Sequence, residues 1–163
     1  MHTLDDVEPN QGRPPPFETS VAPYLLDMSR LAARLVGEGD ADDVAQEALT
    51  RAWQRRTTFD PARGSLRSWL LAITADQARR WRTRRPRPVR SMPRECDTDR
   101  DRALDLRDAV ALLPPRQRLA VELHYYVGLP VGETAEVMGI SDGTVKSTLA
   151  DARARLRTVL EDG

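Results

Sequence analysis

The chain has 163 residues, with 25 basic and 25 acidic side chains and only 5% aromatic residues. This length allows one ordinary domain or two small ones, with a core built mainly from Leu, Val and Ala. The zero net charge hides an asymmetry, because residues 61–94 carry ten arginines against the single Asp76, a net charge of +9. So basic a segment indicates a polyanionic partner, a solvated arginine run being the alternative.

Cysteine content and hydropathy exclude several classes of protein. Cys96 is the only cysteine, so neither an intramolecular disulfide nor a multi-cysteine zinc site can form. The N-terminus lacks a basic start and an apolar run, so it does not read as a signal peptide. No stretch approaches the roughly 20 apolar residues that span a membrane. We therefore expect a cytoplasmic protein without membrane insertion.

The first part of the chain predicts an N-terminal arm and two helices. Residues 1–16 are polar and end in three prolines, which is typical of a disordered or extended arm. A helix is expected over Glu18–Val36, with an irregularity at Pro23 and an apolar face of Tyr24, Met28, Leu31 and Leu35. The next helix runs from Asp40 to about Arg56, with Val44, Ala48, Leu49, Ala52 and Trp53 on its buried side.

The exposed side of the second helix carries Asp43, Gln46, Glu47 and Thr50. Acidic residues at the start of a helix complement its dipole. Capping plus a solvated face would therefore also explain the pattern, and composition alone does not decide between this reading and a binding surface.

A loop and a basic helix come next. Residues 59–64 contain Pro and Gly and predict a loop, after which Ser65 caps a helix from Leu66 to about Arg85. One stripe along this helix, with Trp69 beside it, consists of Leu66, Leu70, Ile73, Gln77 and Trp81. The end of this helix carries Arg79, Arg80, Arg82, Arg84 and Arg85 around Trp81. Cations with an interleaved aromatic can grip phosphates and stack on an unpaired base; dipole compensation, with Trp81 in the core, is the alternative.

Residues 86–102 contain three prolines and dense charge, which predicts a linker. A short helix is expected over Leu104, Leu106, Ala109, Val110 and Leu113. Pro115 then opens a helix that continues through Leu119, Leu123 and Tyr126 to Val127.

The last stretch predicts a helix-turn-helix. Val131, Ala135 and Met138 form one helical face, Gly139 ends that helix, and Ser141 caps the next. The buried face of the second helix is Val145, Leu149, Ala152, Leu156 and Val159. Its other face carries Thr144, Lys146, Ser147, Ala150, Asp151 and Ala154. Such a helix can enter the DNA major groove, whereas an ordinary helical hairpin with a solvated polar face is the alternative.

Four motifs in order resemble those of bacterial sigma factors of the extracytoplasmic-function (ECF) type, in the sigma-70 family. Residues 42–48 resemble the family's polymerase-binding signature, and residues 59–69 resemble the loop and start of its promoter-melting helix. Residues 113–118 resemble the start of its second domain, and residues 139–147 resemble the turn and start of its recognition helix. The resemblance covers about Phe17 to Leu160.

This resemblance implies an all-α fold of two small helical domains joined by a flexible linker, the second carrying the helix-turn-helix. The expected divisions are a disordered arm (1–16), a region 2-like domain (17–85), a linker along the RNA-exit path (86–102) and a region 4-like domain (103–163). The implied partners are core RNA polymerase, promoter DNA and an anti-sigma protein. No cofactor and no metal site are expected.

The resemblance also implies roles for individual residues. The residues implied to bind the polymerase clamp helices are Asp43, Gln46 and Glu47. Those implied to open the −10 element and hold a flipped base are Arg63, Gly64, Asp76, Arg79, Arg80 and Trp81. Those implied to contact the −35 element in the major groove are Ser141, Thr144, Lys146, Ser147 and Arg153.

Three positions depart from the family's usual pattern. Asp76 stands where the melting helix often has asparagine, and its carboxylate would repel phosphate or accept a hydrogen bond from a cytosine amine. Thr148 and Asp151 stand where the recognition helix commonly has basic or aromatic residues. We therefore expect weak intrinsic −35 affinity and a larger share of recognition from the −10 side.

Two other functions remain open at this stage. A free-standing dimeric helix-turn-helix regulator would explain residues 129–160 but leave the earlier motifs without a role. A non-initiating protein that only occupies polymerase or an inhibitor would fit the three departures. An enzyme is not expected, because His2 and His124 have no partner at motif spacing and no phosphate-binding glycine loop is present. Cys96 could sense oxidants or be incidental.

Overall fold

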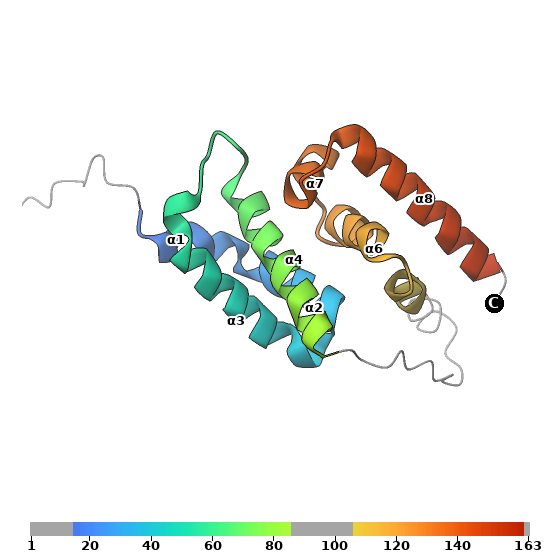
Figure 1. Ribbon diagram of the computed structural model, residues 1–163, viewed down its shortest axis with the longest axis horizontal. Helices are drawn as coiled ribbons and strands as arrows, with labels where there is room; N and C mark the ends of the chain where they lie inside the picture. Colours follow the sequence, from blue (N-terminus) through green and yellow to red (C-terminus); the bar gives the residue numbers. More distant parts are fainter. Residues whose placement is uncertain (1–14, 86–105, 162–163) are drawn as a thin grey trace, which may run out of the picture.

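The computed structural model describes residues 15–85 and 106–161, and within these ranges every regular element is helical. The all-α prediction is confirmed. The predicted linker and nearly all of the predicted arm lie outside the described residues, so the proposed domain boundaries stay a prediction. In Figure 1 the helices form two groups that lie side by side, α1 to α4 and α6 to α8.

The first group contains the helices that follow the arm. They are α1 (Phe17–Val21), η1 (Ala22–Tyr24), α2 (Leu25–Val36), α3 (Glu38–Gln54), η2 (Arg56–Thr58) and α4 (Leu66–Arg84). The single helix predicted over Glu18–Val36 is interrupted at Pro23, as expected. Pro23 lies in the short 3₁₀ turn η1, where its missing N–H disturbs no established helix.

The core of this group lies between α2, α3 and α4. Met28, Leu31, Val44, Leu70 and Leu71 are each at most 1% exposed. Helix α3 presents mainly small side chains to its neighbours, Ala41, Ala48 and Ala52, and therefore lets α2 and α4 approach closely. Each buried leucine stabilises the fold by about 1.5–3 kcal/mol relative to an exposed one. The arrangement holds α4, the basic helix, rigidly against the core.

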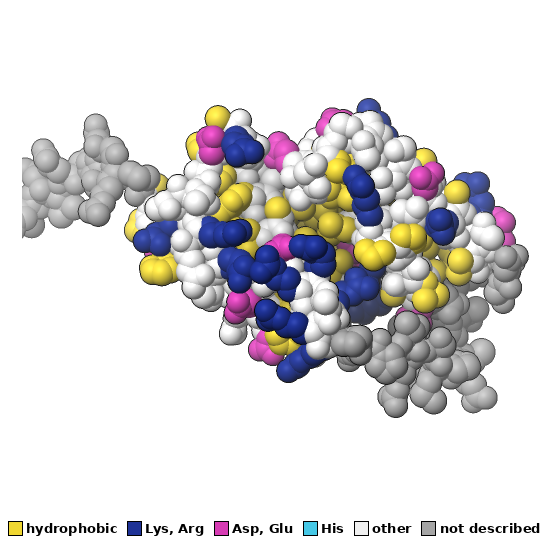
Figure 2. All heavy atoms as spheres, viewed as in Figure 1, with side chains coloured by type: hydrophobic (Ala, Val, Ile, Leu, Met, Phe, Trp, Pro, Cys, Tyr) yellow, Lys and Arg dark blue, Asp and Glu magenta, His cyan; other side chains and the backbone are white. Residues whose placement is uncertain are grey.

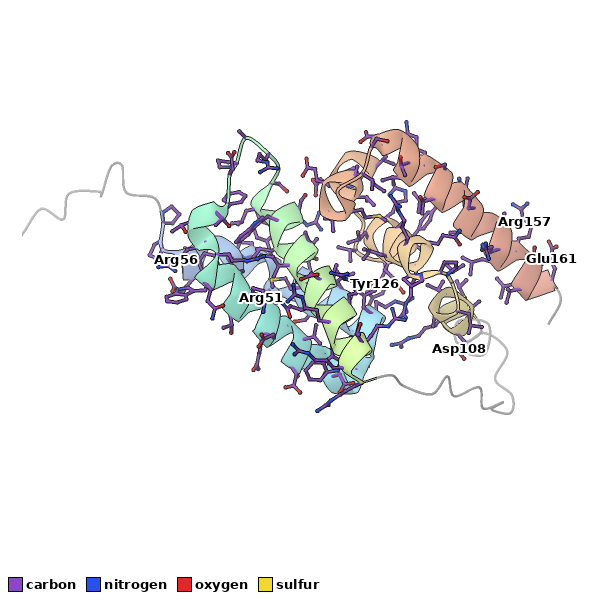
Figure 3. All side chains as sticks on the ribbon, viewed as in Figure 1. Arg51, Arg56, Asp108, Tyr126, Arg157 and Glu161 are labelled. Atoms are coloured by element: carbon purple, nitrogen blue, oxygen red, sulfur yellow. The ribbon has the colours of Figure 1, made fainter. Side chains whose placement is uncertain are left out.

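Trp53 does not lie on the buried side of α3, and the prediction that placed it there is wrong. Its side chain is 48% exposed, and the Arg56 guanidinium stacks 4.3 Å from its ring centroid. Successive helical residues are about 100° apart, so Ala52 takes the inward position at this level and Trp53 turns outward. Arg56 is labelled in Figure 3 at the end of the molecule near α1.

The second group begins with a short helical segment over residues 106–111. It continues with α6 (Pro115–Val121), the π-helical turn η3 (Glu122–Tyr126), α7 (Val131–Met138) and α8 (Asp142–Glu161). Pro115 opens α6 as predicted. The predicted continuation to Val127 is one widened turn, in which the Val127 N–H donates to the Glu122 carbonyl oxygen at 2.9 Å.

The predicted helix-turn-helix is confirmed in α7 and α8. Gly139 ends α7 in the left-handed conformation (φ 64°, ψ 39°), which a glycine adopts without a Cβ penalty. The Ser141 hydroxyl accepts from the Thr144 N–H at 3.2 Å and caps α8. Val145 and Leu149 are buried as expected, whereas Val159 is 48% exposed because α8 extends beyond the small core that it covers.

The described part of the chain contains no helix that is both long and apolar enough to traverse a bilayer.

Candidate nucleic-acid interface

The loop before α4 is held at both ends and presents its middle to solvent. The Asp60 carboxylate accepts from the Ala62 N–H at 2.9 Å, and the Arg63 N–H donates to the Asp60 carbonyl oxygen at 3.0 Å. The Ser65 hydroxyl caps α4 by accepting from the Ser68 N–H at 3.0 Å. Arg63 is exposed between these anchors. We call residues 60–65 the α4 loop, and it projects beyond the helices in Figure 1.

Two aromatic rings lie where the α4 loop meets helix α4. The rings of Phe59 and Trp69 lie 5.5 Å apart, tilted by 51°, and join the loop to the side of α4. Gly64 follows with φ +155°, and a Cβ at that position would lie 3.0 Å from a Glu136 carboxylate oxygen of α7. The backbone conformation therefore favours glycine here, whereas the nearby Glu136 carboxylate is the end of a flexible side chain.

The other end of α4 is strongly basic. Its exposed arginines gather as a dark-blue area over this helix in Figure 2, and they are Arg79, Arg80, Arg82, Arg84 and Arg85. Trp81 is half-buried among them. One side of its ring packs against the core, and the Arg85 guanidinium lies 4.7 Å from its centroid. Trp81 thus combines the two roles considered from the sequence, since it contacts the core and also borders the basic surface.

Asp76 is engaged by the arginines of its own helix. Its carboxylate lies 2.6 Å from Arg79 Nη2 and 2.9 Å from Arg80 Nε. The hydrogen bond from Arg79, followed by the charge of Arg80, lowers the pKa of Asp76 against the opposing effect of desolvation. From the sequence we expected a carboxylate free to face DNA, and that expectation omitted these two ion pairs. The i+3 and i+4 spacing of Arg79 and Arg80 from Asp76 already indicates them.

Replacing Asp76 with asparagine is expected to free Arg79 and Arg80 and to tighten binding of single-stranded DNA. The salt dependence of binding should steepen by about one unit, because one net positive charge is added. Fluorescence anisotropy over a salt series measures this change in binding, and an unchanged salt slope would contradict the prediction.

The lowered pKa of Asp76 also has a consequence for stability. Its ion pairs with Arg79 and Arg80 stabilise the fold above about pH 4, and this contribution is lost as the pH falls through the pKa of Asp76 in the folded protein.

The residues predicted to dock polymerase line a cleft together with the basic helix. Asp43, Gln46 and Glu47 are exposed on α3 and face Arg80 and Trp81 of α4 across a space of about 390 Å³. These two sets of residues lie more than 30 positions apart in the sequence, so we expected them to form two different surfaces. The packing of α3 on α4 brings them to one cleft, with a negative and a positive wall.

The helix-turn-helix presents a second polar surface. Ser141, Lys146, Ser147 and Arg153 are exposed along α8, and Thr144 is half-buried with its hydroxyl 2.8 Å from that of Ser141. All five predicted −35 residues therefore lie on or beside the exposed face of one helix.

Thr148 does not belong to that face, and the effect expected from it on −35 binding stays a prediction. Its side chain is only 9% exposed, and its hydroxyl donates to the Thr144 carbonyl oxygen at 2.7 Å. This hydroxyl bonds its own helix and needs no external partner. Asp151, by contrast, is exposed as expected.

His124 has a structural partner in the described part of the chain, since its Nδ1 lies 2.7 Å from the Leu129 carbonyl oxygen. Among those residues, no group of three or more His, Cys, Asp or Glu side chains could hold a metal ion.

Two regions of one protein family match the chain, one over each of its two helical groups. The description "Sigma-70 region 2" matches residues 21–87, and "Sigma-70, region 4" matches residues 103–156. The first therefore covers the α4 loop and the basic helix, and the second covers the helix-turn-helix.

Relatives with names of the same family match most of the chain. The ECF RNA polymerase sigma factor SigL of Mycobacterium tuberculosis is 34% identical over 146 residues, which cover 82% of this chain and 82% of that protein. The RNA polymerase sigma-E factor of Streptomyces coelicolor is 37% identical over 152 residues, covering 88% and 85%.

Solved structures show the same fold. CnrH, in complex with the cytosolic domain of CnrY, superposes with a TM-score of 0.69 at 26% identity and covers 90% of this chain and 88% of that one. The sigma factor RpoE of Bartonella quintana, in complex with the anti-sigma factor NepR, gives 0.68 at 24% identity over 89% and 96%. Together, the matched regions, relatives and fold show that the chain belongs to the extracytoplasmic-function RNA polymerase sigma factors.

Proposed function

We propose that the chain binds core RNA polymerase and directs promoter-specific transcription initiation by melting the −10 element and recognising the −35 element. The observation that supports this function most strongly is the presence, in one chain, of two different surfaces suited to bind DNA. One is a basic helix with an adjacent open loop, and the other is a helix-turn-helix with an exposed polar face. A single-operator regulator requires only the second surface.

The polymerase contact is assigned to Asp43, Gln46 and Glu47. They are exposed on successive turns of α3, and none of them makes a side-chain hydrogen bond or ion pair to any other described residue. Unpaired exposed carboxylates on a rigid helix suit a basic partner surface, because docking does not first require an internal pair to break.

The −10 contact is assigned to the α4 loop and the basic end of α4. Arg63 is exposed in the loop and Gly64 beside it is half-buried, and we assign to them the site where a flipped base is held. Arg79, Arg80 and Trp81 then follow the strand, with cations for the phosphates and a half-buried ring for a base. Asp76 sets how much of the positive charge of Arg79 and Arg80 is available to the strand.

The −35 contact is assigned to Ser141, Thr144, Lys146, Ser147 and Arg153. Lys146 and Arg153 supply cations for phosphates, and the hydroxyl groups supply short hydrogen-bonding contacts at the start of α8. Residues 114–163 carry six basic and seven acidic side chains, so we expect weak −35 binding by the chain alone.

Replacing Asp151 with arginine is expected to strengthen binding of duplex −35 DNA and to steepen its salt dependence by about one unit, since one phosphate contact is added. Asp151 is exposed in the middle of α8, so the change should leave the fold intact. Glu161→Arg makes the same charge change at the exposed end of α8 and serves as the control. Equal effects of both variants would show that net charge alone, and not the groove-facing position, is responsible.

An anti-sigma protein is the proposed regulatory partner. The similar RpoE chain is solved with the anti-sigma factor NepR and the similar CnrH chain with the cytosolic domain of CnrY, and their helical arrangement matches this chain. The proposed role also places the protein in the cytoplasm, where polymerase and promoter DNA meet.

Run-off transcription with core RNA polymerase, with and without the chain, on a pool of candidate promoters tests the function. Discrete new start sites are expected, and their shared upstream sequences would report what each domain reads. Polymerase binding without starts would favour the non-initiating interaction protein. Tight operator binding by a stable dimer, with no polymerase binding, would favour the free-standing regulator.

A further inference from the structure

The two helical groups share an apolar interface. Leu123 of η3 and Leu129, which follows η3, are at most 1% exposed, and Val137 of α7 is 8% exposed. All three belong to the core cluster of the first group rather than to that of their own group. Helix α7 lies against the first turns of α4, as Figure 1 shows. Over the described residues the chain is therefore closed, and the helical groups proposed to bind the −10 and −35 elements are in contact.

A buried ion pair crosses this interface. Arg34 Nε of α2 donates to a Glu122 carboxylate oxygen at 2.7 Å, and the Glu122 side chain is only 2% exposed. The Arg34 guanidinium also lies 4.6 Å from the centroid of the Tyr126 ring, which is labelled between the two groups in Figure 3. Arg118 donates to the Arg34 carbonyl oxygen. Each of these contacts joins residues more than 80 positions apart.

The same interface places acidic side chains of α7 at the α4 loop. A Glu136 carboxylate oxygen accepts from the Ser65 N–H at 3.4 Å and approaches Gly64. Glu133 lies 3.6 Å from Arg67 Nη1, in the first turn of α4, where Arg67 Nη2 also pairs with Asp27 of α2 at 2.7 Å. The backbone N–H groups at a helix start, together with nearby arginines, are the groups that a phosphate would use. The Glu136 carboxylate, with Glu133 beside it, thus lies at the position proposed for an incoming strand.

We propose that this closed arrangement is autoinhibitory, with α7 acting as an internal substitute for the −10 strand at the α4 loop until the two groups separate. The inference rests on the proposed −10 role of that loop. The interface is suited to reversible opening, because desolvation of the Arg34–Glu122 pair offsets part of the gain from apolar contact. The 20 residues between Arg85 and Leu106 reach at most about 70 Å, which leaves room for separation.

Two variants remove the ion pair from opposite sides of the interface. Glu122→Gln and Arg34→Gln each leave the other charge buried without its partner in the closed form, so both should open the chain. Neither residue lies among those assigned to DNA or polymerase. If Glu122→Gln also disturbs the second group, Arg34→Gln provides the same test from α2. Glu161→Gln, at an exposed position outside the interface, is the matched control.

Opening is measured by fluorescence resonance energy transfer in the full chain. Labels are attached to Gly39→Cys and Asp108→Cys in a Cys96→Ser background, because both positions are exposed and adjoin the Glu38–Arg107 pair, whose charged atoms lie 3.6 Å apart across the interface. In the chain with the unaltered ion pair, energy transfer between the two labels should show one population of high efficiency. Both pair variants should move to lower efficiency, and the control should not. Unchanged efficiency in folded pair variants, as judged by circular dichroism, would overturn the role of the ion pair in closure.

Occlusion is measured with a short, fluorescent single-stranded oligodeoxynucleotide of randomised sequence. If the closed form holds about nine-tenths of the molecules, opening should tighten binding about tenfold, since apparent affinity scales with the competent fraction. Opening without tighter binding would overturn autoinhibition. Run-off transcription by the unaltered chain with core polymerase reports the proposed function separately. Its failure would remove the −10 role itself, whatever the labels show.

Discussion

Replacing Glu47 with arginine is expected to weaken binding to core RNA polymerase by about 30- to 1,000-fold, the range of a charged hot-spot residue at about 2–4 kcal/mol. Glu47 is exposed on α3 and lines the cleft beside Arg80, without an ion pair to another described residue. Reversing its charge should therefore place like charges against a basic partner surface while leaving the fold nearly unchanged. A binding titration with labelled core polymerase measures the loss.

The matched control for this variant is Glu18→Arg, which makes the same charge change at an exposed position in α1. This control should bind polymerase within a few-fold of the unaltered chain. Should both variants lose binding equally, the effect would reflect the overall charge of the first group, and the assignment of the docking surface to α3 would be wrong.

Replacing Leu70 with alanine is expected to give the largest loss of stability, about 2–5 kcal/mol in the free energy of unfolding. Leu70 is fully buried on α4, within the core that α2, α3 and α4 share. The substitution removes apolar contacts and leaves a cavity that the tightly packed neighbours fill only partly. Urea denaturation measures the loss as a lower midpoint with an unchanged slope.

The control for the core prediction is Leu26→Ala, which makes the same truncation on α2 where the side chain is 59% exposed. It should change the free energy of unfolding by no more than about 0.5 kcal/mol. A comparable loss at both positions would mean that the leucine on α2 packs against something other than solvent in the intact protein.

Local patterns in the sequence predicted most of the helices and their ends. The caps at Ser65 and Ser141 and the left-handed Gly139 follow from side-chain chemistry within a few residues, and the structure has all three. The apolar stripes at Met28 and Leu70 were equally readable, because helical periodicity is itself local. These features depend on neighbours in the chain and need no knowledge of the fold.

Contacts between distant segments could not be read in this way. The pairing of Arg34 with Glu122 joins residues 88 positions apart, and the cleft that unites Glu47 with Arg80 arises only when α3 packs on α4. Trp53 was misplaced because residue type favoured burial where the helix geometry does not. The burial of Thr148 was not foreseen for a related reason, since a resemblance identifies a position but not whether its hydroxyl bonds its own helix.

The distribution of tryptophan has a spectroscopic consequence. The three tryptophans of the chain are Trp53, Trp69 and Trp81, and all lie in α3 or α4. Intrinsic emission therefore reports on the first helical group directly, while α6, α7 and α8 contribute helical ellipticity and no indole signal. If the two groups unfold separately, emission and far-ultraviolet ellipticity will give different transition midpoints; if closure couples them, the two curves will coincide. The protein thus carries a built-in optical comparison of its halves, for which no dye is required.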